Sequence, residues 1–370
     1  MLPQPLSSPD DVTHDANNDA QYSIKQSPDG PAMTFSAFAA AANEVSPSGC
    51  AAYTYTLKGF LPYLRGPWYQ FSEQQIDDPN INGGTNPAFP FLTGHGGAMQ
   101  IAPFTFLGLR TDQDVLYVAP SLPPQLPHLR LRRFFFAGAA FDAVLNTTHT
   151  KLTRVPIPAN AGNLNSTGYA GKAMPFIAGT PGNETGNEQY TIAVNQTVVV
   201  PNRLYWQKAT REGNLLQCLP VTSSDAYVAG QLPESATDGA AATAWQPKDG
   251  NASASIWVNT TGVPPQKVRG LWFDFGERPV ANLSVWFFNE TSDRVDEGPV
   301  VSYDSVSANR QEAGPETVLP VQGNTTSIAL AESLDVWTGE WVKLTVQGCA
   351  GCDESEGAGT GGTVAEFVVY

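Results

Sequence analysis

Residues 114–155 read "DVLYVAPSLPPQLPHLRLRRFFFAGAAFDAVLNTTHTKLTRV", and the hydrophobic pattern of the chain changes here. Short alternating runs of apolar and polar residues are separated by Pro, Gly and Asn, which is typical of strands joined by turns. The residues before this stretch have a helical pattern, and those near the end of the chain return to strands. We therefore predict a multidomain α + β protein.

Residues 1–110 are predicted to be helical. The segment "GPAMTFSAFAAAANEV" (30–45) has Pro31 at a first-turn position and is rich in Ala, a strong helix former. A second apolar run, "HGGAMQIAPFTFLGL" (95–109), has helix length and is expected to kink at Pro103. Two or three such helices cannot close a core alone, so we expect them to need neighbours that this chain does not contain.

Three further regions follow. Residues 111–157 are expected to form a small β-domain, and residues 158–197, dominated by Gly, Asn, Thr and Pro, a glycosylated linker. Residues 198–370 carry seven of the eight tryptophans and contain alternating runs such as "EWVKLTVQG" bounded by turns. This spacing favours an antiparallel β-sandwich.

The charge of the chain excludes one class of partner. Only 15% of the 370 residues are charged and the formal net charge is −15, whereas nucleic-acid binding needs a basic patch. No run approaches the roughly 18 apolar residues of a membrane span. We predict neither a nucleic-acid partner nor a membrane span, and no cofactor or metal.

Nine Asn-x-Ser/Thr sequons indicate passage through a glycosylating secretory pathway. All lie after residue 145, although the earlier third is also rich in Asn. The predicted glycosylation sites are Asn146, Asn165, Asn183, Asn195, Asn251, Asn259, Asn282, Asn289 and Asn324. The first residues lack a secretory signal, so we expect an N-terminal part to be missing. The expected location is secreted, in the cell wall or in a vacuolar lumen.

The four cysteines fit an oxidising compartment. The Cys-x-x-Cys at 349–352 has neither a second ligand pair for zinc nor a thioredoxin-like context. We predict a structural disulfide, either between Cys349 and Cys352 or from Cys218 to one of them. Cys50 is expected to be free and buried.

The stretch "WYQFSEQQIDDPNINGGTNPAFPFLTGHGG" (68–97) holds the candidate site. Glu73 lies among aromatic and amide side chains, as a general base that holds a water molecule would. Trp68, Gln74, Thr85 and His95 are candidates for binding a sugar, because aromatic rings suit its C–H faces and polar groups its hydroxyls. The alternatives are a solvated or capping glutamate and a structural histidine.

The segments "SIKQSPDGPAMTFSAFAAAANEVSPSGCAAYTY" (23–55), "FSEQ" (71–74) and "INGGTNPAFPFLTGHGGAMQ" (81–100) resemble the late catalytic domain of fungal acid trehalases, in family 65 of the glycoside hydrolases. The match is dense over residues 21–110 and weaker to about residue 155. The "SEQ" around Glu73 also resembles the base-bearing segment of glucoamylases, where an aromatic residue and an aspartate follow closely. Here Gln75 and Ile76 come before Asp77, so that correspondence is imperfect.

The resemblance implies that residues 1–110 are the last helices of an (α/α)6 barrel. It also implies hydrolysis of α,α-trehalose with inversion, Glu73 acting as the base and the acid lying in an upstream part of the same polypeptide. The isolated chain is then expected to be inactive. Phosphorylases of this family use bound phosphate in place of the base. The absence of a nearby basic residue favours water as the nucleophile.

The segments "ATDGAAATAWQP" (236–247) and "VRGLWFDFGE" (268–277) resemble the discoidin-like, or coagulation factor 5/8 type C, domain. This implies a galactose-binding-like β-sandwich whose loops often bind sugars or surfaces. The alternative is a scaffold with core tryptophans. Two other functions compete with a trehalase: a non-catalytic carbohydrate-binding or adhesion module, and a structural remnant of a truncated gene model.

Overall fold

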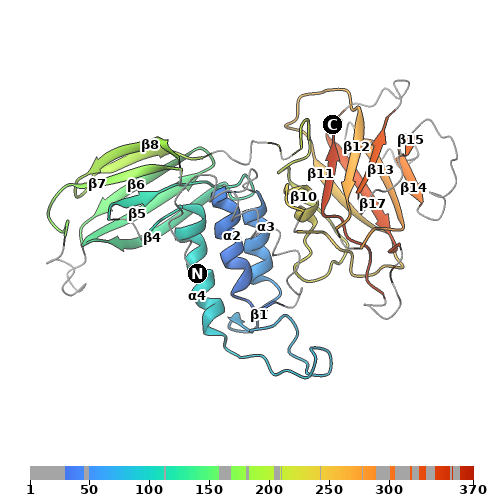
Figure 1. Cartoon of the computed structure of the whole chain (residues 1–370), viewed down its shortest axis with the longest axis horizontal. Coiled ribbons are helices and arrows are strands. Elements are labelled where there is room, and N and C mark those ends of the chain that lie inside the picture. Colours follow the sequence, from blue (N-terminus) through green and yellow to red (C-terminus); the bar gives the residue numbers. More distant parts are fainter. Residues whose placement is uncertain are drawn as a thin grey trace. The chain divides into compact units, whose positions relative to one another are not determined.

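The computed structural model describes most of the chain after residue 29 (Figure 1). The described residues are 30–45, 50–111, 114–157, 168–180, 183–203, 209, 211–241, 243–276, 278–288, 301–304, 317–318, 325–330, 338–350, 352 and 359–370. The chain divides into two compact units, Met1–Lys208 and Ala209–Tyr370, which we call unit 1 and unit 2.

The described part of unit 1 begins with a layer of helices, as the Ala-rich pattern predicts. Its helices are α2 (Thr34–Val45), α3 (Cys50–Phe60), α4 (Leu92–Gln100) and the π-helical segment η1 (Ile101–Phe106). The last of these contains Pro103, whose missing N–H is tolerated because the backbone there widens to bonds such as Leu107 N–H to the Ala102 carbonyl. A short hairpin, β1 (Leu64–Arg65) and β2 (Gln70–Phe71), lies between α3 and α4.

Two larger sheets follow in the described part of unit 1. One has the order β3-β7-β8, with β3 (Leu116–Val118) parallel to β7 (Met174–Thr180) and β8 (Asn183–Ile192) antiparallel to β7. The other is the antiparallel order β4-β5-β6-β9. Its strands are β4 (His128–Phe136), β5 (Ala139–Asn146), β6 (His149–Val155) and β9 (Thr197–Pro201). Side chains from both sheets and from the helices share one core.

Residues 158–197 were expected to form a linker, but the described part of this range contains strands that belong to unit 1. It contains β7 and β8, and Met174, Phe176 and Ile192 are fully buried in the core of unit 1. The Phe176 and Tyr190 rings stack with centroids 5.0 Å apart. Gly, Asn and Thr dominate the composition, but the few apolar residues of these strands suffice to pack against β3.

The described part of unit 2 contains two antiparallel sheets around one hydrophobic core (Figure 1). The first, in the order β10-β11-β17-β13-β14, comprises Val221–Thr222, Ala254–Asn259, Trp341–Gln347, Asn282–Phe288 and Val301–Asp304. The second, in the order β15-β16-β12-β18, comprises Thr317–Val318, Thr325–Ala329, Gly270–Asp274 and Glu366–Val369. The 3₁₀ helix η4 (Pro233–Thr237) packs against β10 and β18.

The core of unit 2 is aromatic. The Phe273 ring stacks on Phe275 and on Phe367, with centroid distances of 5.7 and 5.0 Å. Trp245 is fully buried, and its backbone exchanges both hydrogen bonds with Val364.

Cys349 and Cys352 form a disulfide, as one of the two predicted pairings has it. The other pairing, from Cys218 to one of them, is therefore wrong. Cys50 is buried as expected, but the prediction of a free thiol is wrong, because no described cysteine is free. Among the described helices, none is long and apolar enough to cross a membrane.

Candidate functional site

The hairpin β1–β2 projects two aromatic residues into solvent. Trp68 is 81% exposed and Tyr69 is 71% exposed. Tyr69 has a φ of 52°, a left-handed conformation that few non-glycine residues adopt. The predicted sugar-binding Trp68 is thus placed on an open surface of the described chain.

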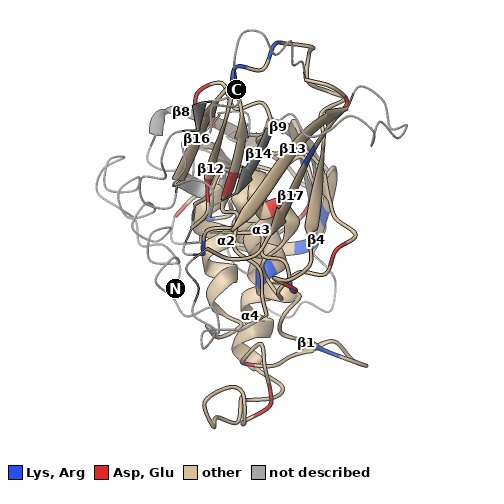
Figure 2. Cartoon of the chain, turned by 90° about the vertical axis from the view of Figure 1, so that its right-hand side faces the viewer, with Lys and Arg blue, Asp and Glu red and all other residues tan. Residues whose placement is uncertain are grey.

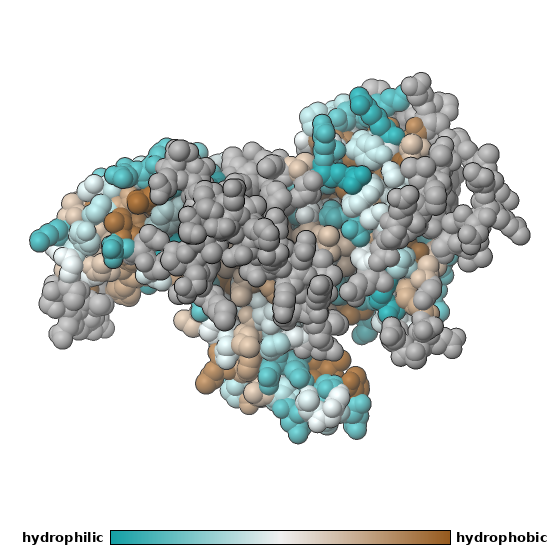
Figure 3. All heavy atoms as spheres, viewed as in Figure 1, coloured by the Kyte–Doolittle hydropathy of each residue, from teal (hydrophilic) through white to brown (hydrophobic). Residues whose placement is uncertain are grey.

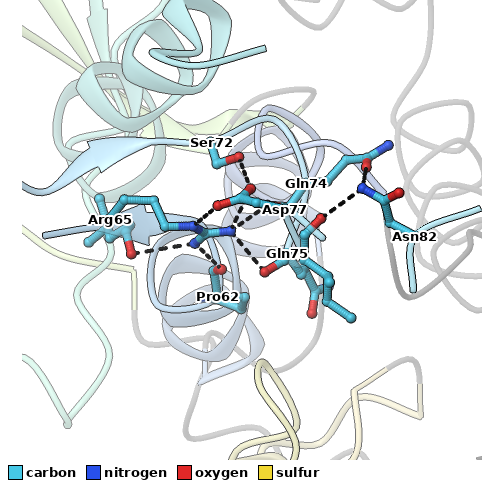
Figure 4. Close-up of polar contacts among 9 residues, drawn as sticks. Pro62, Arg65, Ser72, Gln74, Gln75, Asp77 and Asn82 are labelled. Atoms are coloured by element: carbon cyan, nitrogen blue, oxygen red, sulfur yellow. Dashed lines mark hydrogen bonds and ion pairs between the residues drawn. The ribbon is translucent and has the colours of Figure 1, made fainter. Parts of the chain in front are cut away.

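Arg65 anchors the loop that follows β2 (Figure 4). Its Nε and Nη2 donate to the two carboxylate oxygens of Asp77 at 2.5 and 3.1 Å. Nη2 also donates to the carbonyls of Gln74 and Gln75, at 2.9 and 2.8 Å. One planar guanidinium therefore fixes both the backbone beside Glu73 and the carboxylate at the end of the loop.

Asp77 is ionised by this environment. The hydrogen bond from Arg65 lowers the pKa of Asp77 most, burial opposes it, and the hydrogen bond from the Ser72 hydroxyl and the charge of Arg65 lower the pKa further. A carboxyl held in this way cannot deliver a proton as a general acid. Asp77 serves to hold the loop.

Glu73 is partly buried and tied to the loop before α4. Its N–H donates to the Ala88 carbonyl at 3.0 Å, and the Ala88 N–H donates to its Oε2 at 2.9 Å. Its own carbonyl accepts the Ala32 N–H at 2.9 Å. Oε1 accepts no hydrogen bond from the described residues. Among the contacts of the described residues, the backbone thus fixes one carboxylate oxygen and leaves the other unbonded.

Gln74 and Thr85, two of the predicted sugar-binding residues, lie together and bond to each other. The Gln74 Oε1 accepts hydrogen bonds from the Thr85 hydroxyl at 2.9 Å and from the Asn82 amide at 3.1 Å. The Thr85 N–H in turn donates to Asn82 Oδ1 at 3.0 Å. These bonds close the turn on itself, so both side chains serve the conformation of the loop.

His95 has a structural environment in α4. Its Nδ1 lies 2.9 Å from the Phe91 carbonyl, which can only accept, so Nδ1 is the protonated nitrogen. Its ring lies edge-on to Phe71, with centroids 5.0 Å apart. A Cβ on Gly94 would lie 3.1 Å from Ala32 Cβ and 3.2 Å from Phe71 Cβ, so this glycine permits the close packing of α4.

Arg65 is the residue that the sequence analysis missed. The premise that Glu73 has no basic residue nearby is wrong, because the guanidinium contacts the two residues that follow Glu73. Arg65 is nevertheless occupied by Asp77 and by backbone carbonyls, including that of Pro62. Its pairing joins residues twelve positions apart through a hairpin, and no local pattern marks that.

Five of the predicted glycosylation sites can be placed on the surface or partly exposed: Asn146, Asn195, Asn251, Asn259 and Asn282. Asn183 lies in β8, and Asn165, Asn289 and Asn324 fall outside the described residues.

A second acidic group lies in the interior of unit 2. Glu366 in β18 and Asp238 after η4 are both buried. Burial raises the pKa of the Glu366 carboxyl well above its ordinary value, and the charge of Asp238 raises it further. Among the described residues, no group of three or more His, Cys, Asp or Glu side chains is arranged to hold a metal ion.

No known family profile matches the chain. Individual proteins do. The chain is 38% identical to the cell wall acid trehalase of Arthroderma benhamiae over 99% of its own length and 37% of the relative's. It is 40% identical to the acid trehalase of Emericella nidulans over 94% of its length and 34% of the relative's. A periplasmic/secreted acid trehalase of Candida glabrata is 33% identical over 71% of this chain. The chain spans only about a third of the length of the first two relatives.

Among solved structures, chitosan-binding module 1 of a chitosanase/glucanase from Paenibacillus sp. IK-5 aligns with 43% of this chain and 99% of its own. The identity is 18% and the TM-score 0.31. A putative kojibiose phosphorylase from the human microbiome aligns with 46% of this chain at 12% identity and a TM-score of 0.30. Scores this low carry no conclusion about fold or ligand.

Proposed function

Because this chain is homologous to fungal acid trehalases over almost its whole length, we propose that it is part of a polypeptide that hydrolyses α,α-trehalose to two glucose molecules. The names of the relatives place them in the cell wall or the periplasm, or describe them as secreted. We propose the same route for this chain, in line with its nine sequons.

Glu73 is the proposed general base of an inverting reaction. Its Oε1 takes a proton from the attacking water, while a carboxylic acid on the opposite side protonates the glycosidic oxygen. The two carboxyl groups of such a pair are about 6.5–9.5 Å apart. The fixed Oε2 supports this role, because a base must hold its orientation toward one water molecule. Arg65, through the carbonyls of Gln74 and Gln75, positions the loop in which Glu73 lies.

The general acid is proposed to lie in a preceding part of the polypeptide. In this proposal α2, α3 and α4 are the last helices of an (α/α)6 barrel, the strands of unit 1 form the β-domain beside it, and unit 2 is the discoidin-like sandwich. The helical layer has exposed apolar side chains: Leu92 and Met99 of α4 are each 79% exposed. Such side chains support the proposal that another part of the polypeptide packs against these helices. Figure 3 shows hydrophobic surface at the projecting end that Figure 1 assigns to α4 and the loop after β2.

The observation that carries this proposal is the homology together with the geometry of Glu73. The experiment is Glu73→Gln in the complete enzyme, assayed for glucose release from trehalose. Loss of a general base is expected to lower kcat about 10²–10⁴-fold. Glu188, an exposed residue of β8, provides the matched control, and Glu188→Gln is expected to leave kcat unchanged. Full turnover by Glu73→Gln would exclude the role. This chain alone is expected to release no glucose.

A further inference from the structure

One face of the β-sandwich carries aromatic residues on its outer side. In β11, β17 and β13 the residues alternate, so that Ile256, Leu344 and Val285 enter the core while their neighbours point away from it. Figure 2 shows β13 and β17 side by side with few charged residues. The outward residues that concern us are Trp257, Trp286, Phe288, Trp341 and Lys343, which we call the aromatic face.

The aromatic face is held in place by its own contacts. The Lys343 Nζ lies 4.9 Å from the ring centroid of Trp257 and 4.9 Å from that of Trp286, its cross-strand neighbours on the two sides. The Trp257 and Phe288 rings pack with centroids 5.3 Å apart. These cation–π and ring contacts position the rings of Trp257, Trp286 and Phe288, and the partly exposed outer sides of these rings and of Trp341 form a platform.

Asn259 lies at the edge of this platform. It pairs directly with Trp341 across the strands, so the two Cβ atoms are about 4.5–5.5 Å apart. It also lies on the same side of β11 as Trp257, two residues earlier. Asn259-Thr260-Thr261 is a sequon, and Thr261 is exposed. The Asn259 Oδ1 accepts a hydrogen bond from the Thr261 N–H at 3.0 Å. Its Nδ2 atom makes no hydrogen bond to the described residues.

We propose that Asn259 carries an N-linked glycan whose first N-acetylglucosamine packs on the aromatic face, on Trp341 first. The apolar C–H groups of one side of that sugar would cover the ring, while its hydroxyls remain in water. In the attachment step, Nδ2 forms a bond to C1 of the sugar and loses a proton. The bond from C1 to the diphosphate of a lipid-linked oligosaccharide donor breaks, and the diphosphate leaves with the electron pair.

The other sequons make useful controls because their surroundings differ. Asn251 is exposed in the loop before β11, and Asn146 is exposed in unit 1. Neither belongs to the aromatic face. The proposal rests on the secretory route proposed above, and it does not depend on trehalase activity.

The test compares the 370-residue chain made in a glycosylating yeast with the same chain made in bacteria. Glycopeptide mapping is expected to find Asn259 occupied. In the yeast protein, Asn259→Gln and Thr261→Ala are each expected to lower Tm by about 2–4 °C, the range for one moderate interaction in a domain of this size. In the bacterial protein, neither change is expected to move Tm. Asn251→Gln is expected to have a smaller effect than Asn259→Gln.

Trp341→Ala tests the contact itself. Its loss of Tm is expected to be larger in the yeast protein than in the bacterial protein, and the excess is expected to vanish in the Asn259→Gln background. Trimming the glycan to its first sugar is expected to preserve the effect. Equal losses of Tm in the yeast and bacterial proteins would overturn the proposal. An unmodified Asn259 in a protein that is glycosylated at Asn146 and Asn251 would also overturn it. Neither result would affect the trehalase proposal. Binding of insoluble chitin or β-glucan by the bacterial protein, abolished by Trp341→Ala, would instead assign the face to an external carbohydrate.

Discussion

The helical layer of unit 1 and the β-sandwich of unit 2 differ in how many of their large apolar side chains are exposed to solvent. Strongly exposed large apolar side chains are concentrated between Met33 and Met99, and none lies in the described part of unit 2. In unit 2, Trp245, Phe273 and Phe367 are fully buried. The difference indicates that the sandwich satisfies its own hydrophobic side chains, whereas the helices present a face suited to further packing.

The largest expected difference is between core and exposed truncations. Phe273→Ala is expected to lower the free energy of unfolding of unit 2 by about 3–5 kcal/mol, because it removes a stacked ring from the core. Leu92→Ala, on the exposed side of α4, is expected to change stability by less than about 0.5 kcal/mol. Urea unfolding followed by circular dichroism measures both. A similar cost at the two positions would mean that Leu92 is buried in solution and would break the comparison.

The two units also differ in how pH changes their stability, and the larger change is expected from Glu366 in unit 2. Its pKa is raised by burial, so the folded state favours the protonated form, and a stability cost appears as the pH rises above the ordinary value of 4.5. Glu366→Gln is therefore expected to stabilise unit 2 by about 1–3 kcal/mol at pH 7, and to have no stabilising effect below the ordinary pKa.

Thermal unfolding between pH 4 and 8, in buffer with a chelator for divalent cations, measures this dependence. The chelator ensures that no cation neutralises the carboxylate. A stability gain from Glu366→Gln that stays the same at pH 4 and pH 8 would contradict the assignment.

The smallest expected effect concerns the loop of unit 1 that Arg65 anchors. Arg65→Ala is expected to cost about 1 kcal/mol, since the pairs are partly solvated. The pKa of Asp77 is lowered, so its contribution is present above the ordinary value of 3.8 and is lost as the pH falls through the lower folded value. Asp77→Asn should therefore destabilise unit 1 near neutral pH and have no such effect below the folded pKa of Asp77. The sign of this change in stability is opposite to that expected for Glu366→Gln.

Exposed Arg132 is the matched control for the loop, and Arg132→Ala is expected to leave stability within about 0.5 kcal/mol of the parent. Hydrogen exchange at the amides of Gln74 to Asp77 measures loosening of the loop locally. Unchanged exchange in Arg65→Ala would show that other contacts hold it.

Local patterns sufficed for the elements that depend on neighbours in sequence. The Ala-rich run after Pro31 forms α2, and the alternating stretch from His128 to Val155 forms β4, β5 and β6. The linker prediction failed because composition was weighed above the few apolar positions, such as Phe176, that a strand needs to enter a core.

The surroundings of Glu73 could not be predicted for a different reason. Its carboxylate is held by the backbone amide of Ala88, fifteen residues away, and backbone amides carry no signature in sequence. His95 was predicted to bind a sugar, with a structural role as the alternative, and its bond to the Phe91 carbonyl favours the structural role. The residue types were enough to predict candidate site residues, but the environment of each residue depends on nonlocal hydrogen bonds.

The most direct measurement replaces the carboxylate and supplies a substitute nucleophile. Glu73→Ala in the complete enzyme leaves space for azide, which needs no base to attack C1 of the sugar. We expect added azide to restore turnover of trehalose and to yield β-glucosyl azide, the inverted product, identified by nuclear magnetic resonance. Undiminished glucose release by Glu73→Ala without azide would contradict the proposal that this glutamate activates water.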